Sequence, residues 1–368
     1  MHLKTESLSY VLIVGKLNHL RSLSGEVSIM SKCFRHMALC VAGAGVIIGC
    51  VENTESVGPE EGITAADCRV CHGSNAGIVA IQNQWNASAH VTGNSFARSN
   101  LGDCAGCHSD QGFRERISSA DASLSISGVN DPAPANCRTC HRIHEDYDLS
   151  DYDLRVSPED EVPIHVAGEQ FGYGKGNVCV VCHQPTESDR PPEAGSDGIV
   201  EISSKYWGPH YGTASAILKG TGGYEVEGSM PYRNSAHADM VDACVRCHMS
   251  GSYGNEAGGH RLTLSYPYHG HTADLVKNCT PCHESSIKNF NINSTRDTIG
   301  MLKDSLASLL IARNLLDSAS LRAIPGTYTA LETGALWNYL MVKYDGGMGA
   351  HNYPYEKALL VNSLEALR

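Results

Sequence analysis

The chain has 368 residues, with 40 acidic and 28 basic side chains and a formal net charge of −12. A surface of that sign repels the phosphate backbone, so the charge argues against a nucleic-acid-binding protein and is typical of a soluble, exported body. Five Phe and three Trp are few large aromatic side chains for this length, and 37 Gly are many turn formers. We therefore expect a mainly α fold with short helices, long loops and little β structure.

The first segment that fits a targeting pattern begins at Met30. Residues 1–29 match no such pattern, which favours an over-extended start with Met30 as the true initiator. Lys32 and Arg35 precede an apolar run that is too short to cross a bilayer comfortably. Residues 30–49 are therefore predicted to be a secretory signal peptide.

The end of this signal, Ile47-Ile48-Gly49-Cys50, resembles the lipobox of bacterial lipoproteins. Cleavage before Cys50 would leave that residue to carry the lipid, and the polar stretch over 50–65 is typical of a flexible tether. An ordinary signal peptide or an uncleaved anchor remain alternatives. The expected location is the periplasm, the outer membrane or the cell surface of a bacterium, with the membrane reached through a lipid anchor.

After the tether, the pattern Cys-x-x-Cys-His recurs six times and takes up twelve of the 15 cysteines. The first three copies are Cys68, Cys71 and His72; Cys104, Cys107 and His108; and Cys137, Cys140 and His141. The last three copies are Cys179, Cys182 and His183; Cys244, Cys247 and His248; and Cys279, Cys282 and His283.

The pattern Cys-x-x-Cys-His is the attachment signature of c-type haem. Two thiols three positions apart can reach the two vinyl groups of one porphyrin, and the adjacent imidazole is then held beneath the iron. Residues 66–290 are predicted to form a domain with six haem c groups.

Two other uses of paired cysteines compete with haem. Six pairs could build three four-cysteine zinc sites, and a single pair can serve as a thioredoxin-like redox centre or a disulfide. Neither explains why a histidine follows the second cysteine in every copy. The pattern therefore favours haem iron, with the six motif histidines as proximal ligands.

The ligand on the far face of each iron decides the chemistry. A second imidazole gives a low-spin electron carrier, whereas an open face lets a substrate bind. Nine histidines downstream of Cys50 lie outside the motifs. The candidate distal ligands are His90, His144, His210, His237, His260 and His351, with His271 in reserve. His165 and His269 are weaker candidates, because His165 sits in an acidic loop.

Residues 291–368 contain no cysteine and show helical periodicity. Apolar residues from Ile299 to Leu316 predict a first helix, and Pro325-Gly326 interrupts the pattern. A second helix is expected from about Thr329 to Tyr344 and a third from about Pro354. We expect this C-terminal helical domain to pack on the haem array or on another subunit.

The chain resembles a multihaem c-type cytochrome of bacterial anaerobic or extracellular respiration, and more distantly the lineage of ammonia-forming nitrite reductase and hydroxylamine oxidoreductase. The resemblance rests on Cys244-Val245-Arg246-Cys247-His248-Met249 followed by Gly259-His260, on His237 before that motif, and on Gly349-Ala350-His351 before the last helix. It implies that these histidines are distal ligands and that the final helices form subunit contacts. The catalytic haem of the nitrite reductases usually has Lys in place of the motif His, and all six motifs here end in His.

Three functions are open at this point. The first is a carrier with six bis-histidine haems that exchanges electrons with redox protein donors and acceptors, an extracellular metal oxide or another cytochrome. The second is an oxidoreductase acting on a nitrogen or sulfur compound at one open haem, for which Tyr232, Arg233, His269 and His271 are the residues to test. The third is a subunit of a conductive filament or other homo-oligomer.

Overall fold

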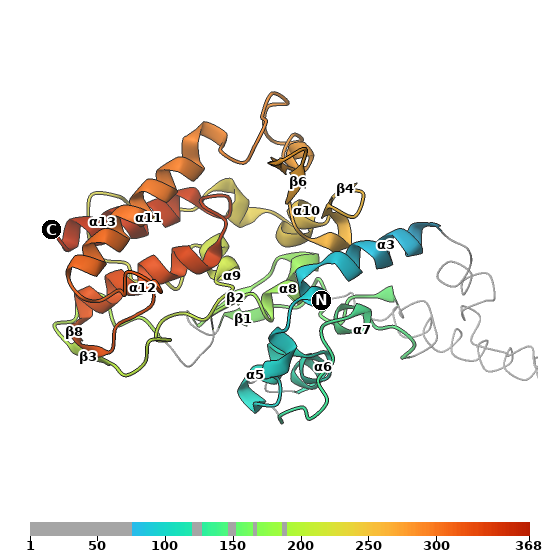
Figure 1. Cartoon of the computed structure of the whole chain (residues 1–368), viewed down its shortest axis with the longest axis horizontal. Helices are drawn as coiled ribbons and strands as arrows, with labels where there is room; N and C mark the ends of the chain where they lie inside the picture. The colour runs from blue at the N-terminus through green and yellow to red at the C-terminus, as the bar shows by residue number, and fades with distance from the viewer. Residues whose placement is uncertain (1–75, 120–126, 146–151, 165–167, 186–189) are drawn as a thin grey trace, which may run out of the picture. The chain divides into compact units, whose positions relative to one another are not determined.

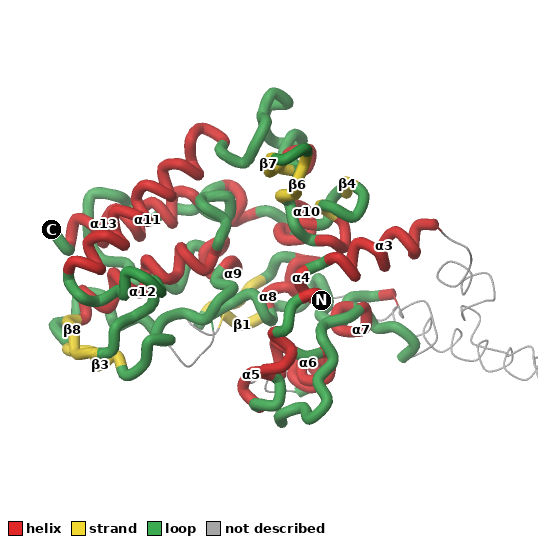
Figure 2. The backbone as a smooth tube through the Cα atoms, viewed as in Figure 1, coloured by secondary structure: helices red, strands yellow, loops and turns green. Residues whose placement is uncertain are grey.

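The computed structural model describes residues 76–119, 127–145, 152–164, 168–185 and 190–368. The predicted signal, Cys50, the tether, the first motif (Cys68, Cys71 and His72) and His165 lie outside these residues. Of the described residues, 44% are helical and 11% are in strands, without a barrel. This mixed structure is compatible with the mainly helical expectation, and Figure 2 shows how much of the backbone is loop.

The longer helices are confined to the two ends of the described chain. The α-helices are α3 (Ala76–Ala87), α4 (Ala89–Thr92), α5 (Gly102–His108), α6 (Asp110–Ser118), α7 (Cys137–Cys140), α8 (Asn177–Val180), α9 (Ala214–Lys219), α10 (Ala243–His248), α11 (Thr295–Ala312), α12 (Ala330–Asp345) and α13 (Tyr353–Ala366). Short 3-10 turns are η1 (Ser95–Arg98), η3 (Gly174–Gly176), η4 (Ala236–Asp239), η5 (Gly259–Arg261), η6 (Val276–Asn278) and η7 (Ile292–Ser294).

All strands of the described residues lie in two-stranded antiparallel sheets. They are β1 (Val162–Ile164) with β2 (Glu169–Phe171), β3 (Ile199–Ile202) with β8 (Gly326–Thr329), β4 (Ser252–Tyr253) with β5 (Ala257–Gly258), and β6 (Ser265–Tyr268) with β7 (His271–Asp274). In the β3–β8 pair, Ile199 lies opposite Thr329. This pair ties the segment after the fourth motif to the entrance of α12.

Helices α11, α12 and α13 pack side by side, in orange and red in Figure 1, and the prediction of three C-terminal helices is confirmed. Helix α12 begins at a capping box in which Thr329 and Glu332 bond each other's backbone N–H groups, and it ends at Gly346 with φ of 68°. The first helix ends earlier than expected, at Ala312. Leu316 lies beyond it, buried in a bridge to Ala323.

The core of these helices includes residues that precede position 291. Ile202, Ile217 and Tyr224 are buried in one apolar cluster with residues of α11, α12 and α13. Asn338, on α12, accepts a hydrogen bond from the Tyr224 backbone N–H and donates one to its carbonyl, both at 2.8 Å. The last three helices are therefore packed with the segment that leads from the fourth motif to the fifth.

A second, smaller core lies beneath the motif cysteines. Its buried residues include Phe113, Phe171 and Val180, and the side chains of Cys140 and Cys182 pack against it. Because the motif helices are only four to seven residues long in α5, α7, α8 and α10, they are too short to be stable alone. Tertiary packing, and any group bound to the cysteines, must hold them in place.

Candidate haem-attachment cysteines and axial histidines

Helical structure places the two cysteines of three motifs on one side of a helix turn. Cys104 and Cys107 lie in α5, Cys137 and Cys140 bound α7, and Cys244 and Cys247 lie in α10. Residues three apart in a helix are neighbours on one face. None of the ten cysteines of the described residues is in a disulfide. Both sulfur atoms of these motifs are thus presented to the same side, as attachment to one flat group requires.

The sixth motif differs from these three, because its cysteines do not lie in a helix. Cys279 and Cys282 lie in a turn that follows η6. The backbone N–H groups of Cys282 and His283 both donate to the Cys279 carbonyl, at 3.1 and 2.9 Å, so a single closed turn still holds the motif. Pro281, between the two cysteines, has no backbone N–H to donate and so does not favour a continued helix here.

Solvent exposure also separates Cys282 from most other motif cysteines. Its side chain is exposed, whereas Cys279 and the cysteines of the second, fourth and fifth motifs are partly buried. A haem attached at Cys282 would therefore present that edge to solvent. The thioether roles of all twelve motif cysteines stay predictions, and Cys68, Cys71 and His72 lie outside the described residues.

Four motif histidines each face a histidine from a distant part of the chain. The ring centroids are 6.1 Å apart for His108 and His210, 6.0 Å for His183 and His90, 6.4 Å for His248 and His351, and 5.9 Å for His283 and His237. In each pair one member belongs to a Cys-x-x-Cys-His motif and the other is a candidate distal ligand. These four distal candidates are brought to four different motifs.

The distance between the two ring centres of each pair matches the distance expected for two imidazoles bound to one metal ion. A metal–imidazole nitrogen bond is about 2 Å long, and the ring centre lies roughly 1 Å behind the nitrogen. Two imidazoles on opposite faces of one iron therefore have ring centres about 6 Å apart. Direct ring stacking would allow a closer approach of about 4.5 Å. The donor set of two thiols and two opposed imidazoles therefore fits a covalently attached haem with both axial positions filled.

The third motif has a histidine neighbour as well. His260 lies close enough to His141 that, after burial, the charge of His141 contributes to lowering the pKa of His260. His144, three residues after His141, has a φ of 56°, in the left-handed region. Five of the six distal candidates, all except His144, thus lie near a described motif histidine across a long sequence separation.

Hydrogen bonds at the other ring nitrogen orient several of these imidazoles. The Nδ1 atoms of His141, His237 and His248 lie 2.9, 2.7 and 2.8 Å from the backbone carbonyl oxygens of Tyr152, Ala350 and Leu262. A carbonyl can only accept, so Nδ1 carries the proton and Nε2 is left with a lone pair. This is the tautomer that binds a metal through Nε2.

Burial keeps most of the paired imidazoles neutral. It lowers the pKa of His90, His210 and His248, and it lowers the pKa of His183 to about 4. A metal ligand must be deprotonated at the coordinating nitrogen, so neutrality favours coordination. His351 differs: burial lowers its pKa, but the carboxylate of Asp345, with smaller contributions from Glu356 and Cys244, raises the pKa to about 9.

The cysteines of different motifs approach one another. The thiol of Cys182 hydrogen-bonds that of Cys107, which lowers the pKa of Cys107 to about 7 with a further contribution from Arg116. Cys179 hydrogen-bonds Cys244 in the same way. The fourth motif therefore contacts both the second and the fifth.

The sixth motif continues this arrangement. The Asn278 side chain, just before Cys279, donates a hydrogen bond of 2.8 Å to the carbonyl of Cys247 in the fifth motif. Arg116 donates to the Cys107 sulfur at 3.1 Å and to the Val181 carbonyl at 2.7 Å. The second, fourth, fifth and sixth motifs thus form a continuous series of contacts.

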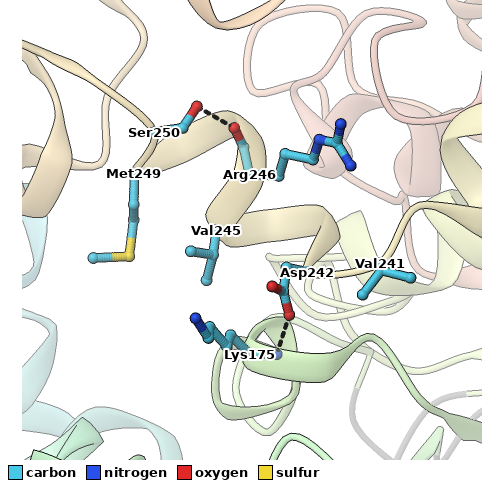
Figure 3. A pocket seen from close by; sticks show the side chains of 7 residues that line it. All are labelled: Lys175, Val241, Asp242, Val245, Arg246, Met249 and Ser250. Atoms are coloured by element: carbon cyan, nitrogen blue, oxygen red, sulfur yellow. Dashed lines mark hydrogen bonds between the residues drawn. The ribbon is translucent and has the colours of Figure 1, made fainter.

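A pocket of about 280 Å³ lies along the fifth motif helix, α10, and beside η3. Its lining is Lys175, Val241, Asp242, Val245, Arg246, Met249 and Ser250 (Figure 3). In Figure 3, Lys175, Val245 and Met249 extend toward the same open space. Asp242 accepts a hydrogen bond of 2.8 Å from the Lys175 backbone N–H.

The reserve histidine and the residues of the enzyme alternative lie elsewhere. His271 is exposed at the start of β7 and packs edge-on against Tyr268 at 5.7 Å, and His269 has a φ of 47° in the turn before it. The Tyr232 hydroxyl donates to the Val226 carbonyl at 2.9 Å, and its ring packs near Tyr355. Within the described ranges, no hydrogen bond or ring contact joins Tyr232 to either histidine.

One residue near the histidines was not expected from the sequence. Asp345, the last residue of α12, lies with its Oδ1 2.6 Å from Nδ1 of His351. The available signal was its position before the Gly346-Gly347 turn that leads to His351. The spacing alone does not indicate that this carboxylate is buried or which side chain it contacts.

Comparisons with protein-family models, with curated proteins and with solved structures found no match to this chain. Among the residues that the structure describes, no group of three or more His, Cys, Asp or Glu side chains is arranged as a metal site. No helix in the same part of the chain is long and apolar enough to cross a membrane.

Proposed function

We propose that this protein is an electron carrier with six covalently attached c-type haems, each coordinated by two histidines. The observation that carries the proposal is the set of four opposed imidazole pairs, each joining a motif histidine to a distant one about 6 Å away. When bound, each haem supplies a reversible one-electron couple. The two histidines of each pair would hold the iron from both sides, which would keep a substrate away from it at these four sites.

The remaining two ligand pairs follow from the remaining histidines. His260 is proposed as the distal partner of His141, because the two are electrostatic neighbours. His144 then becomes the partner of His72 in the first motif by elimination. With these assignments each of the six distal candidates is used once, and His271 is not required.

Contacts between motifs support transfer from one haem to the next. Cys107 meets Cys182, and Cys179 meets Cys244. Groups attached to these thiols would be held with their edges close together, which favours rapid electron exchange. The proposed partners are redox proteins, another cytochrome or an extracellular metal oxide.

Export belongs to the same proposal. The charge pattern before position 37 and the Ile-Ile-Gly-Cys sequence ending at Cys50 support a lipoprotein signal. We propose that the mature chain begins at Cys50 and is anchored by lipid at the periplasmic or outer face of the cell. Mass spectrometry of the mature N-terminus tests this, and an intact residue 49–50 bond in the exported protein would contradict it.

The decisive experiment counts haems and their spin states in the purified full chain. Pyridine haemochrome absorbance against protein concentration should give six haems per chain. Electron paramagnetic resonance of the oxidised protein should then contain low-spin ferric signals and no high-spin ferric signal.

Peptide mapping tests two attachment points: Cys71, which lies with Cys68 outside the described residues, and Cys282, which is exposed. Proteolytic peptides that contain Cys71 or Cys282 should each carry the mass of a haem. A free thiol at either position in the haem-loaded protein would contradict the thioether assigned to that cysteine.

The spin-state measurement also separates the alternatives. A high-spin signal equivalent to one haem, which changes when nitrite or hydroxylamine is added, would overturn the carrier in favour of an enzyme with one open haem. Zinc in place of haem, in a ratio of about one metal to four cysteines, would overturn the cofactor assignment itself.

A further inference from the structure

The strongest remaining feature is the buried carboxylate of Asp345 behind His351. The Asp345 side chain is 0% exposed, and its Oδ1 lies 2.6 Å from His351 Nδ1. Its Oδ2 accepts a hydrogen bond of 2.8 Å from the Gly347 backbone N–H. Both carboxylate oxygens are therefore occupied, and the group cannot turn away from the imidazole.

A carboxylate on α13 also holds the turn between Asp345 and His351 in place. The backbone N–H of Gly349 donates to both carboxylate oxygens of Glu356 on α13, at 3.1 Å each. Gly349 has a φ of 90°, a conformation that a residue with a side chain rarely adopts. The position of His351 relative to Asp345 is thus determined by α12, by α13 and by the glycine turn between them.

This imidazole differs from the others in the charge of its acceptor. His141, His237 and His248 use neutral backbone carbonyls at Nδ1, whereas His351 uses a carboxylate. A carboxylate acceptor makes the imidazole a more basic ligand, because it draws the Nδ1 proton away from the ring. A more basic axial ligand and a nearby buried negative charge both stabilise the ferric state over the ferrous state.

We propose that Asp345 is a positioning residue that lowers the reduction potential of the haem held by the fifth motif, through the imidazole of His351. The inference rests on the proposed function, since it requires a haem between His248 and His351. Of the four imidazoles compared above, His351 alone has a charged acceptor. Among the haems that these imidazoles would bind, the haem of the fifth motif is therefore expected to have the lowest reduction potential that the axial ligands produce.

The test is a potentiometric titration of the full-length, haem-loaded protein and of the Asp345→Asn variant. The amide keeps the size of the side chain and an oxygen that can accept from Nδ1, and it removes the charge. One of the six couples is expected to shift upward by at least a tenfold change in its equilibrium constant, which is about 59 mV for one electron. The variant should still give six low-spin haems, so a shift cannot be ascribed to loss of the ligand.

Asp304→Asn is the matched control, because Asp304 is exposed on α11 and should leave all six couples unchanged. Six low-spin haems with unchanged potentials in Asp345→Asn would overturn the inference and leave the proposed function standing. An unaltered protein with no haem, or with a single-histidine fifth haem, would overturn the proposed function and the inference together.

If Asp345→Asn does not load haem, the unaltered protein decides the question. Its oxidised-minus-reduced infrared difference spectrum should contain a histidine ring band of a strongly hydrogen-bonded imidazole, and His351→Ala should lose that band. A spectrum in which His351→Ala removes no such band would overturn the inference.

Discussion

An imidazole becomes an axial ligand when its coordinating nitrogen gives up its proton and its ring is correctly turned and close to the far face of an iron. In this chain, burial supplies the neutrality for His90, His183 and His210 by lowering their pKa values. Backbone carbonyls supply the orientation for His237 and His248. Burial and the bond from His237 to Ala350, which lies 113 residues away, both depend on the packing of distant segments.

Removing a distal histidine is expected to open one haem without affecting the others. His210→Ala should add a high-spin ferric signal equivalent to one haem, because His108 would be left as the only axial ligand of its iron. His271→Ala is the control, since His271 is exposed on β7 and faces Tyr268. Equal spin-state spectra for the two variants would contradict the assignment of His210.

At the scale of elements, the short motif helices and the long C-terminal helices are stabilised differently. Helices α5, α7, α8 and α10 have at most seven residues, and cysteines of the third and fourth motifs pack against the small core around Phe171. Helix α12, by contrast, is buried over nearly its whole length and packs against α11 and α13. The C-terminal core is therefore the part of the fold whose stability depends on ordinary apolar packing.

Truncation in that core should be costly. Leu336 on α12 is 0% exposed, and Leu336→Ala should lower the free energy of unfolding by about 2 to 5 kcal/mol. Met301→Ala on α11 is the matched control, because Met301 is 65% exposed and its truncation should change stability by less than about 0.5 kcal/mol. Denaturant unfolding followed by Trp fluorescence measures both, and equal midpoints would contradict the packing of α12.

For the whole molecule, the charge of −12 sets which partners associate quickly. Opposite charge steers encounter, and added salt screens this attraction over about 8 Å at physiological ionic strength. Electron exchange with a cationic redox protein should therefore be faster than with an anionic one of similar potential, and it should slow as salt is raised. Stopped-flow spectroscopy measures the rates, and a rate that rises with salt for the cationic partner would contradict this prediction.

The sequence predicted the three C-terminal helices well, because their periodicity and end signals are local. Thr329 and Gly346 act within one turn of α12, and the structure places its ends there. The end of α11 was predicted less well: Leu316 fits the apolar spacing, but it is buried in a bridge to Ala323 beyond the helix. Apolar periodicity indicates that a residue is buried. It does not distinguish a residue in a helix from one in a loop that packs on the same core.

For the candidate site, the sequence alone supplied the six proposed attachment points, because Cys-x-x-Cys-His is a contiguous pattern whose chemistry depends on neighbouring residues. It also supplied a set of candidate distal histidines without their partners. Only the tertiary structure decided which histidine faces which motif, such as His351 against His248, and it alone brought Asp345 to the Nδ1 of His351. The physical reason is that an axial pair and its hydrogen-bonded carboxylate are joined by packing between distant segments, and pairing across such distances leaves no periodic or adjacent signal in the sequence.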